Sequence, residues 1–141
     1  MDGRIVLEIM KKEIKTLKDF QRILQGERDA IISFSLEGII QENNRKEELI
    51  RRLEYLKAEK EKIISAFDQE SLKQSEAWRS LSRDMERTME EVRIAMEKNM
   101  KLLSFSIDHV RSSIEHIVGF INSTGYGRKM EQMPLLISKV M

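Results

Sequence analysis

One apolar pattern constrains the fold of this chain more than any other feature. From Trp78 to Ile121, apolar side chains recur at steps of three or four residues, the spacing of one face of a helix. At ~1.5 Å per residue this helix is about 66 Å long, so it needs partners along its length or leaves part of the face exposed. The face consists of Trp78, Leu81, Met85, Met89, Val92, Met96, Asn99, Leu103, Ile107, Val110, Ile114, Ile117 and Ile121, in which Asn99 is the polar exception.

Two shorter helices are predicted before it. The first covers about residues 4–32, and Gly26 weakens it by about 1 kcal/mol relative to alanine, enough to end or kink it there. Ser33 or Ser35 is expected to cap the second helix, over about residues 36–66, because a short hydroxyl can accept an orphan backbone N–H. The middle of that helix, residues 41–48, is wholly polar, so a looser or open contact is expected there.

A third helix is predicted over about residues 71–122, with Asp68 as a cap before it. The pattern predicts an all-α fold, an elongated antiparallel coiled-coil-like bundle of three long helices. Residues 1–122 would form this helical domain, and residues 123–141 a flexible tail that is either a short helix from Pro134 or disordered. Because the third helix is longer than the others, part of its apolar face is expected to be exposed and to bind a partner.

Composition narrows the class of protein. The chain has 25 basic and 24 acidic residues in close alternation, so it lacks the concentrated basic face of a nucleic-acid binder. No stretch approaches the length of a membrane span, and the N-terminus lacks the apolar core of a signal peptide. Cysteine is absent, which excludes disulfides and thiolate metal sites. We therefore expect a cytoplasmic protein.

The chain shows no pattern typical of catalysis. His109 and His116 lie two helical turns apart, about 10 Å, too far to share one metal ion from the same helix. The carboxylates lie in charge-alternating helices rather than in paired apolar settings, and no glycine-rich phosphate loop is present. We expect neither an enzyme nor a metal or cofactor site.

Nine methionines suggest two uses of this flexible side chain. Met85, Met89 and Met96 are predicted to fill the core, whereas the tail methionines, Met130, Met133 and Met141, are predicted to bind a partner, because no core pattern includes them.

The order of several short motifs resembles a known family. Glu27-Arg28-Asp29-Ala30-Ile31-Ile32 ends the first helix, and Leu36-Glu37-Gly38-Ile39-Ile40 starts the second. A Lys46-Glu47-Glu48-Leu49-Ile50-x-x-Leu53-x-x-Leu56 segment, Asn99-Met100-Lys101-Leu102-Leu103 and a late Tyr126-Gly127 follow. In order, spacing and length this chain resembles the FlgN family of flagellar export chaperones over nearly its whole length. It has Ser35-Leu36-Glu37 where relatives often have Asp-Leu-Glu, and serine caps as well as aspartate.

The resemblance implies a chaperone that binds the C-terminal helical region of the hook-associated proteins FlgK and FlgL, prevents their premature assembly and delivers them to the export gate. The family's Asn-x-x-Leu-Leu element corresponds to Asn99, Leu102 and Leu103, and its tyrosine to Tyr126, which with Gly127 would contact the cytoplasmic domain of FlhA. An amphipathic client helix needs an apolar stripe. The expected client-binding residues are Asn99, Leu102, Leu103, Ile107, Val110, Ile114, Ile117 and Ile121.

Other interpretations remain open. The tail residues Leu135, Leu136 and Ile137 are expected to fold over the stripe when no client is bound. The alternatives in function are a structural coiled-coil scaffolding protein that self-associates and a FliT-type chaperone of the filament cap. The sequence also leaves open whether the protein is a monomer or a homodimer.

Overall fold

A computed structural model of the chain describes residues 3–66 and 69–124. Within these residues all regular structure is helical, which confirms the all-α prediction: α1 (Gly3–Ile32), α2 (Leu36–Ile64), α3 (Gln69–Lys73) and α4 (Glu76–Ser123). The chain divides into two compact units, residues 1–100 and residues 101–141, so α4 contributes to both. The predicted tail begins where the described residues end.

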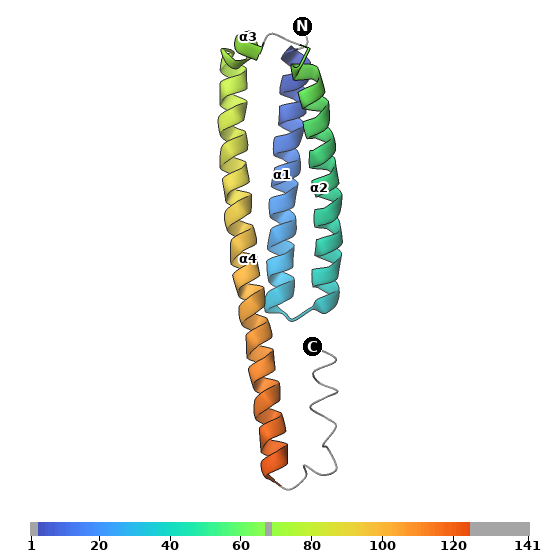
Figure 1. Ribbon diagram of the computed structural model, residues 1–141, viewed down its shortest axis with the longest axis vertical. Coiled ribbons are helices and arrows are strands. Elements are labelled where there is room, and N and C mark those ends of the chain that lie inside the picture. The colour runs from blue at the N-terminus through green and yellow to red at the C-terminus, as the bar shows by residue number, and fades with distance from the viewer. Residues whose placement is uncertain (1–2, 67–68, 125–141) are drawn as a thin grey trace. The chain divides into compact units, whose positions relative to one another are not determined.

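The first unit is a three-helix bundle in which α1 is the central helix. Figure 1 shows α2 antiparallel to α1, and the first half of α4 running in the same direction as α1 on its other side. Helix α1 is consequently buried on a broad face, including Val6, Met10, Phe20 and Leu24, whereas the one buried residue of α2 is Leu56. An apolar core cluster joins Leu17, Phe20 and Leu24 of α1 to Val92 of α4, with Leu49, Leu53, Met85 and Ala95 packed against it.

The first helix runs through Gly26 to Ile32, which confirms its predicted range of about residues 4–32, so it does not end at this glycine. A β-carbon at Gly26 would lie 3.1 Å from the carboxylate of Glu42 on α2. The glycine therefore makes room for a close contact between α1 and α2. Tertiary packing here outweighs the low helix propensity of glycine.

The polar middle of α2 is not an open stretch, contrary to the prediction. Besides the Glu42–Gly26 contact, Lys46 of this segment forms an ion pair of 2.5 Å with Glu27 of α1, and both side chains are largely buried. The contact between the helices is polar rather than loose at this point. Further along, Lys60 of α2 pairs with Glu13 of α1 at 2.9 Å.

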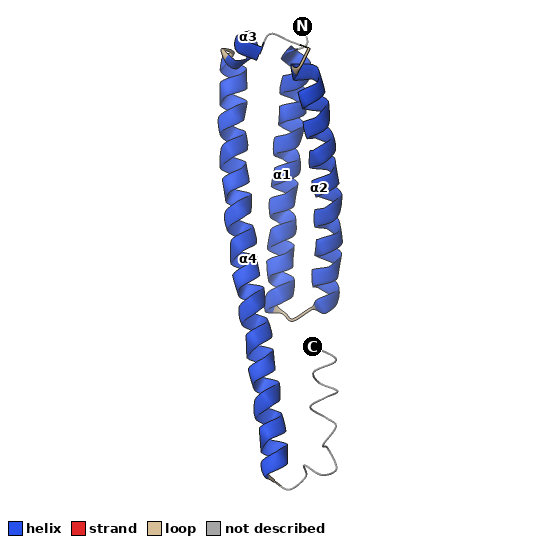
Figure 2. Ribbon diagram, viewed as in Figure 1, coloured by secondary structure: helices blue, strands red, loops and turns tan. Residues whose placement is uncertain are grey.

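A short α3 precedes α4, so the third long helix starts at Glu76 and not near residue 71. Helix α3 ends at Lys73, and Ser75 caps α4 by accepting the N–H of Trp78 at its Oγ. Figure 2 shows α3 as a separate helical segment before α4. The predicted cap Asp68 lies outside the described residues.

The α1–α2 connection has an unusual backbone. Phe34 has φ +56°, in the left-handed region that usually holds glycine. The N–H of Phe34 donates to the carbonyl of Ile31 and that of Ser35 donates to Ala30, the two bonds of a Schellman C-cap. Ser35 then caps α2 by accepting the N–H of Gly38 at its Oγ, 3.1 Å away, which confirms one of the two predicted caps.

Replacing Phe34 with glycine should stabilise the protein. The left-handed conformation costs an L-residue about 1–2 kcal/mol, and the Phe34 side chain is 61% exposed, so little packing is lost. We expect Phe34→Gly to raise the free energy of unfolding in urea by about 1 kcal/mol. Phe34→Ala, which keeps the backbone strain, is the matched control and should give no such gain. Equal stability of the two variants would contradict this explanation.

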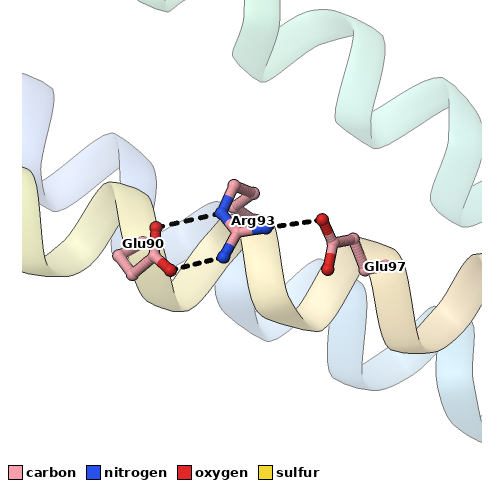
Figure 3. A network of polar contacts seen from close by, with 3 residues as sticks. All are labelled: Glu90, Arg93 and Glu97. Carbon is pink, nitrogen blue, oxygen red and sulfur yellow. Dashed lines mark hydrogen bonds and ion pairs between the residues drawn. The ribbon is translucent and has the colours of Figure 1, made fainter.

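Arg93 is the centre of a group of charge pairs on the exposed face of α4. In Figure 3, Arg93 donates hydrogen bonds to Glu90 on one side and to Glu97 on the other. The hydrogen bond from Arg93 lowers the pKa of the Glu90 carboxyl below its ordinary value, and the same bond raises the pKa of Arg93. All three side chains are exposed, so their contribution to stability is small.

The pKa of Glu90 should respond to Arg93 and not to Glu97. In Arg93→Gln we expect the carboxyl titration of Glu90, followed by carbon-13 NMR, to move up towards its ordinary value because the hydrogen bond is lost. Since the folded-state pKa is lowered, any stabilisation by Glu90 is present above its unfolded-state pKa and disappears as the pH falls through the folded value. Glu97→Gln is the control. An unchanged Glu90 midpoint in Arg93→Gln would rule out this assignment.

Candidate partner-binding surface

The second half of α4 has an apolar stripe that is partly open to solvent. Ile107, Val110 and Ile117 are exposed, and Leu102, Leu103, Ile114 and Ile121 are partly exposed. All seven belong to the set predicted from sequence, and all lie in the unit of residues 101–141. Six of them, without Leu102, recur at steps of three and four residues, so they form one continuous face.

Ser123 and Thr124 cap the C-terminal end of α4, where the stripe ends. Thr124 donates from its backbone N–H to the carbonyl of Phe120, and its side chain donates to the carbonyl of Ile121 at 2.9 Å. Ser123 likewise bonds to Phe120 with its hydroxyl. These bonds satisfy carbonyls that the helix end leaves without intrahelical donors, so α4 ends at Ser123, close to the predicted residue 122.

Asn99 has a different environment from the rest of the predicted set. It is only 4% exposed, and its side-chain amide donates to the carbonyl of Leu24 at 2.8 Å and to the Glu27 carboxylate at 3.0 Å. Glu27 also accepts from Lys46, so one buried carboxylate joins α1, α2 and α4. In this structure Asn99 holds α4 against α1, and a direct contact with a client would require the bundle to open.

Two exposed aromatic residues were missed by the sequence analysis. Phe105 and Phe120 are both largely exposed in the second half of α4. By helical spacing Phe105 lies opposite the stripe and Phe120 at its edge, so neither fits the periodic pattern. A signal was available, because Phe105 stands between two serines, where no core pattern explains an aromatic side chain.

The described residues contain no candidate metal-binding cluster and no candidate membrane span. No three histidine or acidic side chains within residues 3–66 and 69–124 are placed to hold a metal ion. In the same part of the chain, no helix is long and apolar enough to cross a membrane. The exposed apolar stripe of α4 is the candidate partner-binding surface among the described residues.

Comparison with known protein families identifies the family of this chain. A family model described as FlgN protein matches residues 1–133. The chain belongs to the FlgN family. FlgN proteins are flagellar export chaperones, which agrees with an all-helical chain that has an open apolar stripe. No curated protein and no solved structure matches it.

The family match includes the stripe of this FlgN protein and part of the tail. Tyr126 and Gly127, predicted to contact the export gate, and Leu135, Leu136 and Ile137, predicted to cover the stripe, lie outside the described residues. The tail methionines, Met130, Met133 and Met141, lie there too. These assignments remain predictions.

Removing the buried amide of Asn99 should weaken the bundle. In Asn99→Leu the Glu27 carboxylate loses a donor in a largely buried setting, which typically costs about 1–3 kcal/mol. We expect a reduction of that size in the free energy of unfolding measured with urea. Ser112→Leu, at an exposed position of the same helix, is the control and should change it by less than about 0.5 kcal/mol. An Asn99→Leu variant as stable as the wild type would contradict the role assigned to this amide.

Proposed function

We propose that this FlgN protein binds the C-terminal helical region of the hook-associated proteins FlgK and FlgL through the stripe on α4, Leu102 to Ile121. The exposure of Ile107, Val110 and Ile117 carries the proposal, because an amphipathic client helix can bury its own apolar face against them. Covering the client's assembly surface in this way would keep it from assembling in the cytoplasm, where we place the protein.

The second half of α4 would also be stabilised by such a partner. Helices of this length are only marginally stable in water without tertiary packing. A client that buries the stripe would stabilise the second half of α4 at the same time as it is itself held helical. This coupling suits a chaperone that must release its client, because much of the interaction free energy is used to order the two partners.

Charge substitutions on the stripe should abolish client binding. We expect Val110→Glu and Ile117→Glu to reduce the capture of FlgK and FlgL C-terminal fragments in pull-down assays at least tenfold, because each would bury a carboxylate against an apolar client face. Ser112→Glu, on the opposite side of the same helix, adds the same charge and should retain binding. Failure of the wild-type protein to bind either fragment would refute the proposal.

The same assay separates the remaining alternatives. Preference for the C-terminal region of the filament-cap protein would favour a FliT-type chaperone. A protein that binds no flagellar fragment and self-associates would favour a structural coiled-coil scaffold. Light scattering of the free protein decides between a monomer and a homodimer, and an increase in mass after deletion of residues 128–141 would support a tail that covers the stripe.

Tyr126 is proposed to act at the export gate rather than on the client. We expect Tyr126→Ala to retain binding of FlgK fragments but to weaken binding to the cytoplasmic domain of FlhA and the secretion of FlgK. Tyr126→Phe, which keeps the ring, is the matched variant for the hydroxyl group. Equal loss of client binding and gate binding in Tyr126→Ala would instead assign the tyrosine to the client or to the fold.

A further inference from the structure

A groove of about 360 Å³ opens on the three-helix unit, separate from the stripe. Its apolar lining comes from all three helices: Leu17 of α1, Ile50 and Leu53 of α2, and Met85 and Met89 of α4. Ile50 is 42% exposed and Met89 is 55% exposed, so the apolar lining continues to the outer surface. The groove is therefore open to an apolar side chain from outside.

The residues of α4 that line the groove are not the ones that this helix buries. The buried position is Thr88 and not Met89, and Thr88 satisfies its hydroxyl by donating to the carbonyl of Asp84 at 2.7 Å. The predicted core role is thus wrong for Met89, which is exposed, and for Met96, which is also exposed. Only Met85 packs against the core cluster. Flexible methionine side chains at an open groove suit a surface that adapts to a partner.

A buried carboxylate lies within this apolar lining. Glu13 is only 5% exposed, and the ammonium group of Lys60 lies 2.9 Å from its Oε1. The two groups form an ion pair at this distance, and Oε1 itself is shielded from solvent. The charge of Glu13 is therefore already compensated by Lys60, and the carboxylates on the rim are the ones open to a ligand.

The charged side chains on the rim of the groove indicate which charge a ligand should carry. Glu54 and Glu61 stand on it with Lys57, while Lys60 is already engaged by Glu13. Three carboxylates against two ammonium groups leave the groove with one excess negative charge. Apolar surface with an excess of carboxylates favours a ligand that is both aliphatic and basic.

We propose that this groove binds an amphipathic helix of a partner protein, with an aliphatic side chain between Met85 and Met89 and an arginine or lysine directed at the rim carboxylates, Glu54 and Glu61. The available volume accommodates a few side chains, which is the scale of one or two turns of a docked helix. The proposal rests on the proposed chaperone function in one respect only: the partner is taken to be the client. It adds a second contact, in the first unit, to that of the stripe.

Methyl NMR of the full chain tests the groove directly. With carbon-13 methyl groups on methionine, and Met85→Leu and Met89→Leu used for assignment, two probes are titrated. The first is the FlgK or FlgL C-terminal fragment, and the second is a designed helical peptide with leucines on one face and arginine one turn away. We expect both to shift the Met85 and Met89 signals. A designed peptide with glutamate in place of arginine should bind about tenfold more weakly.

A matched pair of substitutions on α2 provides the control. Ile50→Lys places a positive charge in the groove, whereas Ile40→Lys makes the same change at a position of similar exposure, 53%, outside it. We expect Ile50→Lys to raise the Kd for the arginine peptide about tenfold and Ile40→Lys to leave it within about twofold. Circular dichroism verifies that both variants are folded.

The outcomes separate this inference from the proposed function. If the client fragments bind by calorimetry but leave Met85 and Met89 unshifted, and Ile50→Lys behaves like Ile40→Lys, the groove proposal is overturned and the stripe proposal stands. If the fragments do not bind at all, the proposed function fails, while the designed peptide still tests the groove: no shift overturns it. Methyl shifts that depend on protein concentration without any peptide would assign the groove to a second copy of the chain and also overturn it.

Discussion

The carboxylate of Glu27 is the interaction on which the arrangement of the three-helix unit depends. It accepts from Lys46 of α2 and from Asn99 of α4, so one buried group relates all three helices. A carboxylate this far from solvent is tolerable only with its partners in place, since loss of one partner of a buried pair typically costs about 3–5 kcal/mol. The ion pair between Glu13 and Lys60 repeats the one between Glu27 and Lys46, 14 residues away along both α1 and α2. This spacing corresponds to two heptads, and the two pairs together oppose a shift of one helix along the other.

Asn99 also marks a change in how α4 uses its apolar residues. Up to this point the buried and half-buried positions at helical spacing are Leu81, Met85, Thr88, Val92, Ala95 and Asn99, a spacing typical of a coiled coil. The step from Asn99 to Leu103 is a second step of four in succession, an irregularity that shifts the apolar face slightly around the helix. The stripe that follows has its own regular spacing and exposed side chains. We propose that one helix thus serves two purposes, a structural one before Asn99 and a binding one after it.

Periodicity predicted the existence and type of the long helices, because each has an apolar face at helical spacing and recognisable breaks such as Ser35. It also predicted most of the open stripe, since no equally long helix was available to cover it. It could not show that Thr88 and Ala95 pack inwards while Met89 and Met96 face out, because hydrophobicity alone favours methionine over threonine or alanine at a core position. The pairing of Lys46 with Glu27, the contact at Gly26 and the left-handed Phe34 depend on long-range or backbone geometry that a local pattern does not contain.

We propose that α4 is a structural helix before Asn99 and a client-binding helix after it. Hydrogen exchange of the full chain, read by mass spectrometry with and without a FlgK C-terminal fragment, tests this claim most directly. We predict slow exchange in α1, α2 and residues 76–100 of the free protein, rapid exchange in residues 101–123, and a clear gain in protection in that second segment when the fragment is added. Equal protection of both halves of α4 in the free protein, or a gain confined to residues 76–100, would contradict the account.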